Sequence, residues 1–246
     1  QRLPPRIKDP VEHITIGSRL STFFERRDFM ASTFLVIGLG RFGTNLALRL
    51  MDSGNEVLVI DSDEEAVSRI APHVTQSKVG DCMDEEVLRS LDPSSFDFCF
   101  VCISENFQSS LETTSLLKEM GAPMVVAKAD RDLHARLLLK IGADEVVFPE
   151  RDMAQRTAVR FSVNGALEYI ELAPGYAIFE LDVPDDWAGS TLLDLDIRKR
   201  WNVNVIGRKE DGAILPIDAV KFVFAADTHI LVAGRPDDIN RMVKGK

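Results

Sequence analysis

The stretch FLVIGLGRFGTNLALRL, residues 34–50, decides the fold of this chain. Its first four residues form an apolar run of the kind that fills a buried strand. Phe42, Leu46 and Leu50 then recur every four positions, which indicates one face of a helix. Between the two lies a G-x-G-x-x-G motif at residues 38–43. A strand, a Gly-rich loop and a helix in this order predict the first unit of a Rossmann-like parallel sheet.

The three glycines of the motif predict a phosphate-binding loop. Gly38 allows the tight turn, Gly40 lets a pyrophosphate approach the backbone, and Gly43 permits close packing of helix on sheet. The helix that begins at Arg41 and Phe42 directs N–H groups and partial positive charge at the same place. The Arg41 guanidinium adds a bidentate donor, which favours a ligand with more phosphate charge, such as ATP; the alternative is a solvated arginine at a helix start.

Two acidic residues extend this pattern. Asp61 ends the next apolar strand, 18 residues after Gly43, where it can accept hydrogen bonds from ribose hydroxyls. Asp81 follows the third strand, at the edge where doubly wound sheets bind ligands. We expect Asp81 either to reach the adenosine or to cap the helix that follows.

Strands and helices alternate through the first 150 residues. Strands are predicted at 33–37, 56–60, 76–79, 96–103, 124–128 and 145–148. This alternation predicts an α/β domain, a doubly wound parallel sheet with helices on both faces.

After Pro149 the pattern changes. A long helix is predicted at 151–166, followed by strands at 176–182, 203–209 and 229–233 and helices at 192–200 and 236–244. We therefore expect four parts: an N-terminal leader (1–32), a nucleotide-binding Rossmann domain (33–150), a crossover helix and linker (151–170), and a small α+β lobe (171–246).

The charge of the chain is unevenly distributed. It carries 29 Lys and Arg against 39 Asp and Glu, a net charge of −10, and residues 33–150 alone hold 10 basic and 20 acidic side chains. Such a surface repels a phosphate backbone, so we expect no nucleic-acid partner. No apolar run approaches the roughly 20 residues that a membrane span needs. We therefore expect that the chain does not itself cross a membrane, and its three cysteines, Cys82, Cys99 and Cys102, fit a reduced cytoplasmic protein without a disulfide framework.

The leader is different, because residues 1–32 have a net charge of +2. Leu20, Phe23 and Phe24 lie among arginines, which indicates a short amphipathic helix. Such a helix would cover a partner or a membrane surface; the alternative is a leader that packs on its own domain.

Cys99 and Cys102 form a C-x-x-C within an apolar run typical of a buried strand. Three residues along a strand span about 10 Å and place the two side chains on opposite faces. A disulfide needs Cα atoms within about 7 Å, so we expect free, buried thiols.

Residues for catalysis are not evident in the sequence. Neither Tyr169 nor Tyr176 begins a Y-x-x-x-K, and the four histidines form no metal-ligand cluster or hydrolytic triad. A site that binds a nucleotide without transforming it acts through different affinities for two conformations. The sequence therefore predicts a sensor and not an enzyme.

Several further runs share one order with a known family: VLVIDSDEEAV, GDCMDEEVL, SENFQSSLETTSLLKEMG, KADRDLHARLLLKIGADEVVFPERDMAQR and STLLDLDIRKRWNVNVI. From residue 33 to the C-terminus the chain resembles cytoplasmic regulatory subunits of Ktr/Trk potassium-uptake systems, of the KtrA/TrkA type. The resemblance implies an RCK (KTN) Rossmann domain, a crossover helix and a C-terminal RCK lobe. It also implies dimers that assemble into an octameric ring on the cytoplasmic face of the membrane. There the ring would gate a potassium-translocating subunit according to bound ATP or ADP.

The resemblance implies roles for single residues as well. Gly38, Gly40, Arg41 and Gly43 match its phosphate loop, Arg41 as the sensor of the γ-phosphate, and Asp61 matches its ribose-binding acid. Lys128 resembles a basic residue near the nucleotide and a subunit contact. Glu150 matches an acid that holds a divalent cation, Mg²⁺ or Ca²⁺, with ATP; the alternative is an ordinary glutamate at a helix start.

The second lobe of some family members binds cyclic di-AMP. Ile197, Arg198, Asn204 and Pro216 fall where that site would lie, whereas Lys199-Arg200-Trp201 departs from the residues expected there.

An alternative function uses the same fingerprint. The Gly-rich loop and Asp61 also suit NAD or NADH, as in an oxidoreductase or an NAD-binding redox sensor.

Overall fold

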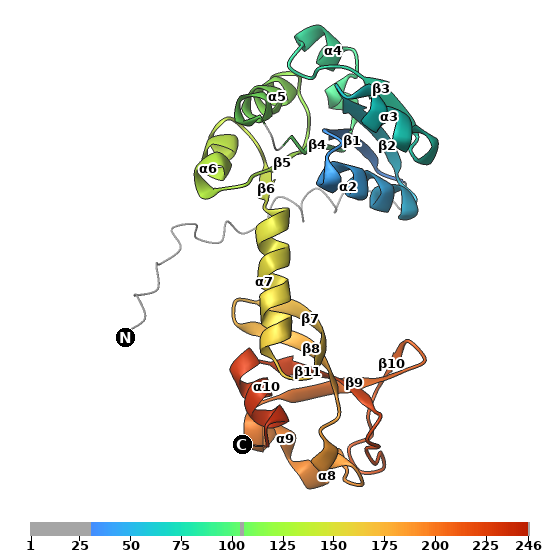
Figure 1. Ribbon diagram of the computed structural model, residues 1–246, viewed down its shortest axis with the longest axis vertical. Coiled ribbons are helices and arrows are strands. Elements are labelled where there is room, and N and C mark those ends of the chain that lie inside the picture. The colour runs from blue at the N-terminus through green and yellow to red at the C-terminus, as the bar shows by residue number, and fades with distance from the viewer. Residues whose placement is uncertain (1–30, 104–105, 246) are drawn as a thin grey trace. The chain divides into compact units, whose positions relative to one another are not determined.

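The computed structural model of the chain describes residues 31–103 and 106–245 and divides them into two compact units, with the boundary between Pro149 and Glu150 (Figure 1). The amphipathic helix expected around Leu20, Phe23 and Phe24 lies outside the described residues. Within the described ranges, no helix combines the length and the apolar character that a membrane span requires.

The first unit is a parallel six-stranded sheet in the order β3-β2-β1-β4-β5-β6. This is the strand order of a doubly wound dinucleotide-binding sheet, and the predicted fold class is confirmed. The strands are β1 (Thr33–Ile37), β2 (Glu56–Asp61), β3 (Gln76–Val79), β4 (Phe98–Val101), β5 (Val125–Lys128) and β6 (Glu145–Val147). The helices are α2 (Arg41–Asp52), α3 (Glu64–Ile70), α4 (Glu85–Arg89), α5 (Phe107–Glu119) and α6 (Asp132–Lys140).

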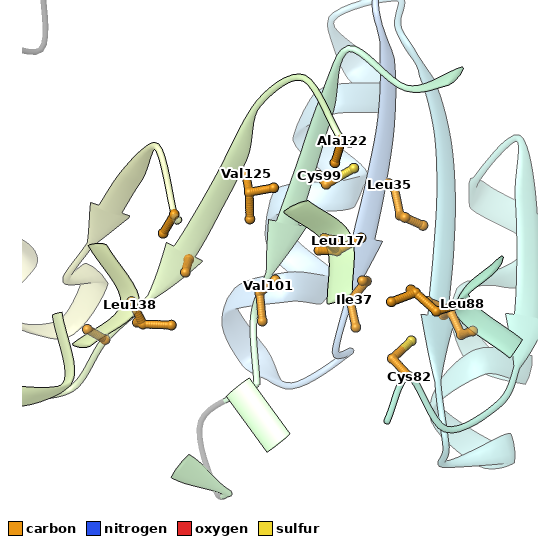
Figure 2. Close-up of a cluster of buried hydrophobic side chains, with 14 of the residues drawn as sticks. Leu35, Ile37, Cys82, Leu88, Cys99, Val101, Leu117, Ala122, Val125 and Leu138 are labelled. Atoms are coloured by element: carbon orange, nitrogen blue, oxygen red, sulfur yellow. The ribbon is translucent and has the colours of Figure 1, made fainter. Parts of the chain in front are cut away.

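Alternation along β1 explains why both faces of the sheet are covered. Leu35 and Ile37 face one buried cluster together with Leu88 and Leu117 (Figure 2). Phe34 and Val36, the residues between them, belong to the cluster on the other face. A strand buried on both faces needs a continuous apolar run, which residues 34–37 supply.

The second unit is an antiparallel five-stranded sheet in the order β10-β9-β11-β8-β7. Its core contains Trp187, whose ring lies 6.2 Å from that of Trp201 and 5.6 Å from that of Phe224. The strands are β7 (Ala166–Ala173), β8 (Tyr176–Asp182), β9 (Asn204–Glu210), β10 (Ala213–Leu215) and β11 (His229–Gly234). The helices are α7 (Pro149–Ser162), α8 (Leu192–Leu195), α9 (Ile197–Trp201) and α10 (Pro236–Val243).

The prediction of a helix and linker up to residue 170 is wrong from residue 166 onward, because a strand begins there. Helix α7 ends at Ser162, and β7 starts at Ala166 and pairs antiparallel with β8. Asn164-Gly165 and Pro174-Gly175 bracket this strand, and such pairs are the turn signals that would have revealed it.

Two smaller predictions in the second unit also need correction. The helix expected at 192–200 is divided at Asp196, whose φ of +45° is incompatible with a continuous helix. Strand β10 was not predicted, although Asp211-Gly212 forms a two-residue turn with φ of +49° and +80° between β9 and β10. Asp-Gly is a strong hairpin signal because both central residues of such a turn need positive φ.

Helix α7 has no buried side chain. Met153 and Phe161 are 59% and 78% exposed on it, whereas Val159 is partly buried against the core of the second unit.

Candidate functional site

The Gly-rich loop joins β1 to α2 at the carboxyl edge of the sheet, and the fold itself requires two of its glycines. Gly38 has a φ of +95°, and a Cβ on it would lie 3.1 Å from the carbonyl carbon of Cys102. A Cβ on Gly43 would lie 1.9 Å from the carbonyl oxygen of Gly38, far inside van der Waals contact. These glycines let α2 start directly against the end of β1 and the end of β4.

Gly40 differs from its two neighbours in the motif. Its φ of −62° and ψ of −178° are open to any residue. In the part of the chain that the structure describes, no atom lies within 4 Å of the position a Cβ would take. Neither the backbone conformation nor the packing of the chain calls for glycine here, and the open space leaves the backbone accessible to a ligand.

The start of α2 presents N–H groups for which the helix offers no carbonyl acceptor. Its first helical hydrogen bond runs from Thr44 N–H to the Gly40 carbonyl at 3.0 Å, which leaves the N–H groups of Arg41, Phe42 and Gly43 ahead of it. Among the described residues no side chain caps this start, and its first turn holds no acidic residue. It is therefore a local site of positive potential within an acidic domain.

The next two helices of the first unit start differently. Asp63 accepts a hydrogen bond from Glu65 N–H at 2.9 Å at the start of α3, and Asp84 accepts one from Glu86 N–H at 2.9 Å at the start of α4. Both helices also carry acidic residues in the first turn. The starts of α3 and α4 are neutralised by acidic side chains of the chain itself, whereas the start of α2 is not.

Arg41 and Phe42 point to different environments. Arg41 is exposed, and among residues 31–103 and 106–245 its side chain makes no ion pair. Phe42 is half-buried and packs against the cluster that contains Val36 and Cys102. The guanidinium is accessible to a ligand, whereas Phe42 offers its backbone N–H.

Asp61 connects the end of β2 to the loop. One carboxylate oxygen accepts a hydrogen bond from Leu39 N–H at 2.5 Å, and the other accepts one from Asp63 N–H at 2.9 Å. A carboxylate offers about four acceptor positions, so two remain for ribose hydroxyls. Thr44, which the sequence analysis did not single out, also holds the loop, because its hydroxyl donates to the Leu39 carbonyl at 2.9 Å. No sequence signal identifies that bond.

Asp81 lies on the same edge but does not cap the next helix. Its carboxylate accepts a hydrogen bond from Met83 N–H at 2.9 Å, and the N-cap of α4 is Asp84. The capping alternative is therefore wrong. Asp81 is exposed after β3, which leaves it open to a ligand.

Lys128 ends β5 and is buried, with its ammonium 3.4 Å from a carboxylate oxygen of Asp130. Burial raises the pKa of the Cys102 thiol to about 12, and the charge of Lys128 opposes that rise. Cys102 in turn lies 3.1 Å from the Cβ position of Gly43. Lys128 therefore places a buried positive charge on the loop side of the sheet.

The cysteines are free and buried, as predicted. Cys99 and Cys102 belong to the clusters on opposite faces of the sheet, so they do not face each other. Burial raises the pKa of Cys82 and of Cys99 to about 12 as well. These thiols are packing residues.

Glu150 belongs to the second unit, whereas the Gly-rich loop belongs to the first. Glu150 lies there in the first turn of α7. Within the described ranges there is no group of three or more His, Cys, Asp or Glu that could hold a metal ion. A cation at Glu150 would therefore need ligands from elsewhere, such as phosphate oxygens and water.

The four residues expected to bind a second ligand differ in their exposure to solvent. Ile197 is 2% exposed in the core of the second unit, so its side chain is not available to a ligand. Arg198 is exposed on α9, and Pro216 is exposed after β10. Asn204, at the start of β9, donates to the Tyr176 hydroxyl at 3.3 Å.

Two domain families match this chain, one in each unit. The TrkA-N domain matches residues 34–149, and the TrkA-C domain matches residues 176–244. Ktr system potassium uptake protein C of Bacillus subtilis (strain 168) is 39% identical over 215 residues, which cover 87% of this chain and 97% of that protein. Ktr system potassium uptake protein A of Vibrio alginolyticus is 35% identical over 211 residues, 86% and 96% of the two chains.

Solved structures of the GsuK channel share the fold. One has a TM-score of 0.59 at 19% identity, covering 91% of this chain and 42% of the GsuK chain. A second, described as the GsuK channel bound to NAD, has a TM-score of 0.57 at 19% identity, covering 91% and 43%. At this identity the likeness concerns the fold alone. The family follows from the domain matches and the relatives: the chain belongs to the TrkA-N/TrkA-C proteins of Ktr potassium-uptake systems, a family of regulatory and not enzymatic proteins.

Proposed function

We propose that this chain is a nucleotide-sensing regulatory subunit that controls a Ktr-type potassium-uptake system by binding ATP or ADP at the Gly-rich loop. One observation carries the proposal: the uncapped start of α2, which leaves N–H groups and the exposed Arg41 around the open backbone of Gly40. A chain with a net charge of −10 does not attract nucleotides at long range, so the attraction must come from this local site.

In this proposal each residue of the site has one role. The N–H groups from Gly40 to Gly43 bind the inner phosphates, and Arg41 contacts the γ-phosphate, which ADP lacks. Asp61 accepts the ribose hydroxyls through its remaining acceptor positions, Asp81 lies toward the adenosine, and Lys128 adds positive charge. For ATP and ADP to favour different conformations, one of them must make a contact that the other does not make.

A divalent cation fits the same proposal if ATP supplies part of its coordination. Magnesium is commonly held by one or two carboxylates together with phosphate oxygens and water. Glu150 supplies one carboxylate, so Mg²⁺ or Ca²⁺ would bind here with ATP and not on its own. Removing divalent ions is expected to weaken ATP binding and to leave ADP binding less affected.

The proposed partner is a membrane potassium-translocating subunit. Relatives named as Ktr potassium-uptake proteins support it. The chain would act as dimers in an octameric ring, at the cytoplasmic face of the membrane and attached through that partner. We also propose that cyclic di-AMP binds at Arg198, Asn204 and Pro216. A titration of the full chain with cyclic di-AMP that gives neither heat nor a thermal shift would refute this site.

The test compares two arginines of one helix. Arg41→Ala removes the γ-phosphate contact, whereas Arg49→Ala removes an exposed arginine whose ion pair with Asp52, at 3.2 Å, lies at the other end of α2. By isothermal titration calorimetry, we expect Arg41→Ala to weaken ATP about tenfold or more, because a hydrogen bond to a charged group contributes about 1.5–3 kcal/mol. ADP affinity should fall less, and Arg49→Ala should change neither.

Two results would overturn this assignment. Equal losses for ATP and ADP in Arg41→Ala would remove the γ-phosphate role. Tight binding of NADH that neither ATP nor ADP displaces would make the chain an NAD-binding sensor instead, a ligand class that the similar fold of the NAD-bound GsuK channel keeps relevant.

A further inference from the structure

A groove of about 490 Å³ crosses the amino-terminal edge of the sheet in the first unit. It runs from Thr33 at the start of β1, past Leu58 on β2, to residues 75–78 on β3. The Gly-rich loop, Asp61 and Asp81 follow the opposite ends of these strands. The groove is therefore separate from the candidate nucleotide site, and its volume lies within the range of small-molecule pockets, about 300–1,000 Å³.

The floor of the groove is apolar. Leu58 and Phe96 are only partly buried against the core, and Leu91 lies beside them. A ligand that covers these side chains with an apolar body removes apolar surface from water, which is favourable. The floor therefore suits an apolar body of any shape that fits, and the polar side chains around it determine which charge the ligand carries.

Lys78 supplies the positive charge of the groove. Its half-buried ammonium donates a hydrogen bond to the Ser90 hydroxyl at 2.5 Å, and that hydroxyl donates to the Val87 carbonyl at 2.6 Å. Among residues 31–103 and 106–245, Lys78 makes no ion pair. An ammonium has three N–H donors, so two of them remain for a ligand. An unpaired cation beside an apolar floor favours an anionic group with an apolar body.

Gln76 and Glu56 also line the groove, one near Lys78 and one at the other end. Gln76 pairs in register with Leu58 and lies two residues before Lys78, so its side chain is on the same face of the sheet as both. Its carboxamide can donate to the same anion. Glu56 lies two residues before Leu58, at the start of β2, and is exposed. Its carboxylate repels a second negative charge at that end.

From this arrangement we propose that the groove binds an organic monocarboxylate with an apolar body. Lys78 and Gln76 bind the carboxylate, whereas the body contacts Leu58, Leu91 and Phe96. Charge complementarity at the lysine end, and an acidic side chain at the other end, define this ligand class. An alcohol of the same length lacks the anion, and a dicarboxylate of the same length carries one charge too many, so both should bind more weakly.

The first test measures which charge the groove prefers. Octanoate, octanol and octanedioate have chains of the same length and differ in charge, and isothermal titration calorimetry on the full chain compares them. We expect octanoate to bind about tenfold more tightly than the other two. Lys78→Gln should weaken octanoate about tenfold and leave octanol unchanged. Lys140→Gln removes an exposed lysine of α6 outside the groove and should change neither affinity.

The second test locates the ligand. Gln76→Trp keeps Lys78 and places an indole beside Leu58, so it should abolish the binding of octanoate and of octanol. Ser68→Trp places the same side chain on the exposed face of α3, outside the groove, and should bind both as the unchanged chain does. In hydrogen exchange, octanoate should slow the amides at 76–78 and 90–96 and leave those at 38–44 unchanged. Circular dichroism confirms that the variants are folded.

Several results would overturn the proposal. An absence of octanoate binding would do so, as would equal affinities for octanoate and octanol, or an unchanged octanoate affinity in folded Lys78→Gln. Octanoate binding that survives in Gln76→Trp would place the ligand outside the groove. Displacement of octanoate by ATP would place its carboxylate at the Gly-rich loop instead.

Discussion

Substitution of Gly40 by alanine separates the fold of the loop from its ability to bind phosphate. Alanine can adopt the φ of −62° at this position, and no described atom lies within 4 Å of the new Cβ. Alanine is a poorer N-cap than glycine, which costs a few tenths to about 1 kcal/mol. The lower entropy of the unfolded chain returns about 0.4–1 kcal/mol. The free energy of unfolding should therefore change by less than about 1 kcal/mol.

Ligand binding should respond much more strongly to the same methyl group. It stands where a phosphate must approach the N–H groups at the start of α2. Loss of one charge-assisted hydrogen bond, about 1.5–3 kcal/mol, corresponds to a fall in ATP affinity of roughly 10- to 100-fold. Urea unfolding followed by circular dichroism gives the stability, and isothermal titration calorimetry gives the affinity.

Gly43→Ala is the matched control for this experiment. Its Cβ would lie 1.9 Å from the Gly38 carbonyl oxygen, so the backbone must shift, at a cost of about 2 kcal/mol or more. We expect it to lose stability, and Gly40→Ala to lose only affinity. Unchanged ATP affinity in Gly40→Ala would refute the loop as the phosphate site, and an equal loss of stability in both variants would refute the distinction between the glycines.

Three further predictions concern the first unit. Asp144→Ala removes the carboxylate that pairs with the Lys118 ammonium at 2.9 Å and accepts from Val125 N–H at 2.8 Å, and it should cost about 3 kcal/mol in urea unfolding. Breaking the exposed Arg49–Asp52 pair with Asp52→Ala should cost less than about 1 kcal/mol. Burial lowers the pKa of His134, so the folded chain binds fewer protons than the unfolded one. Stability should therefore fall as pH drops below the unfolded value of about 6.5, more steeply than in His134→Leu; equal slopes would contradict this. The three cysteines, each with a pKa of about 12, should resist iodoacetamide at pH 8 in the folded chain and react in denaturant, as mass spectrometry would show.

The sequence was informative where local chemistry and the fold agree. The apolar run at 34–37, the glycines at 38 and 43, and the alternation up to Pro149 specify a parallel sheet, because each follows from burial or close packing. The second unit was less predictable. Strand β7 follows directly on a helix, and its edge position leaves Ile170 and Leu172 exposed, which weakens the alternation that marks a strand.

Site residues could be predicted by type and position, but not their partners. Asp61 stands at the end of β2 as expected, yet its bond to Leu39 N–H depends on how β2 and the loop meet. Ile197 illustrates the opposite case, because its burial depends on long-range packing of the second unit. The roles assigned to Glu150 and Arg41 remain predictions for the binding experiments.

The exposure of α7 has a thermodynamic consequence. An isolated helix of its length, 14 residues, is marginal in water, and α7 gains little from its own chain because none of its side chains is fully buried. By mass action, anything that covers Met153 and Phe161 stabilises this helix, in proportion to the logarithm of its concentration over its dissociation constant. The stability of helix α7 therefore depends on the concentration and affinity of whatever binds the face that carries Met153 and Phe161.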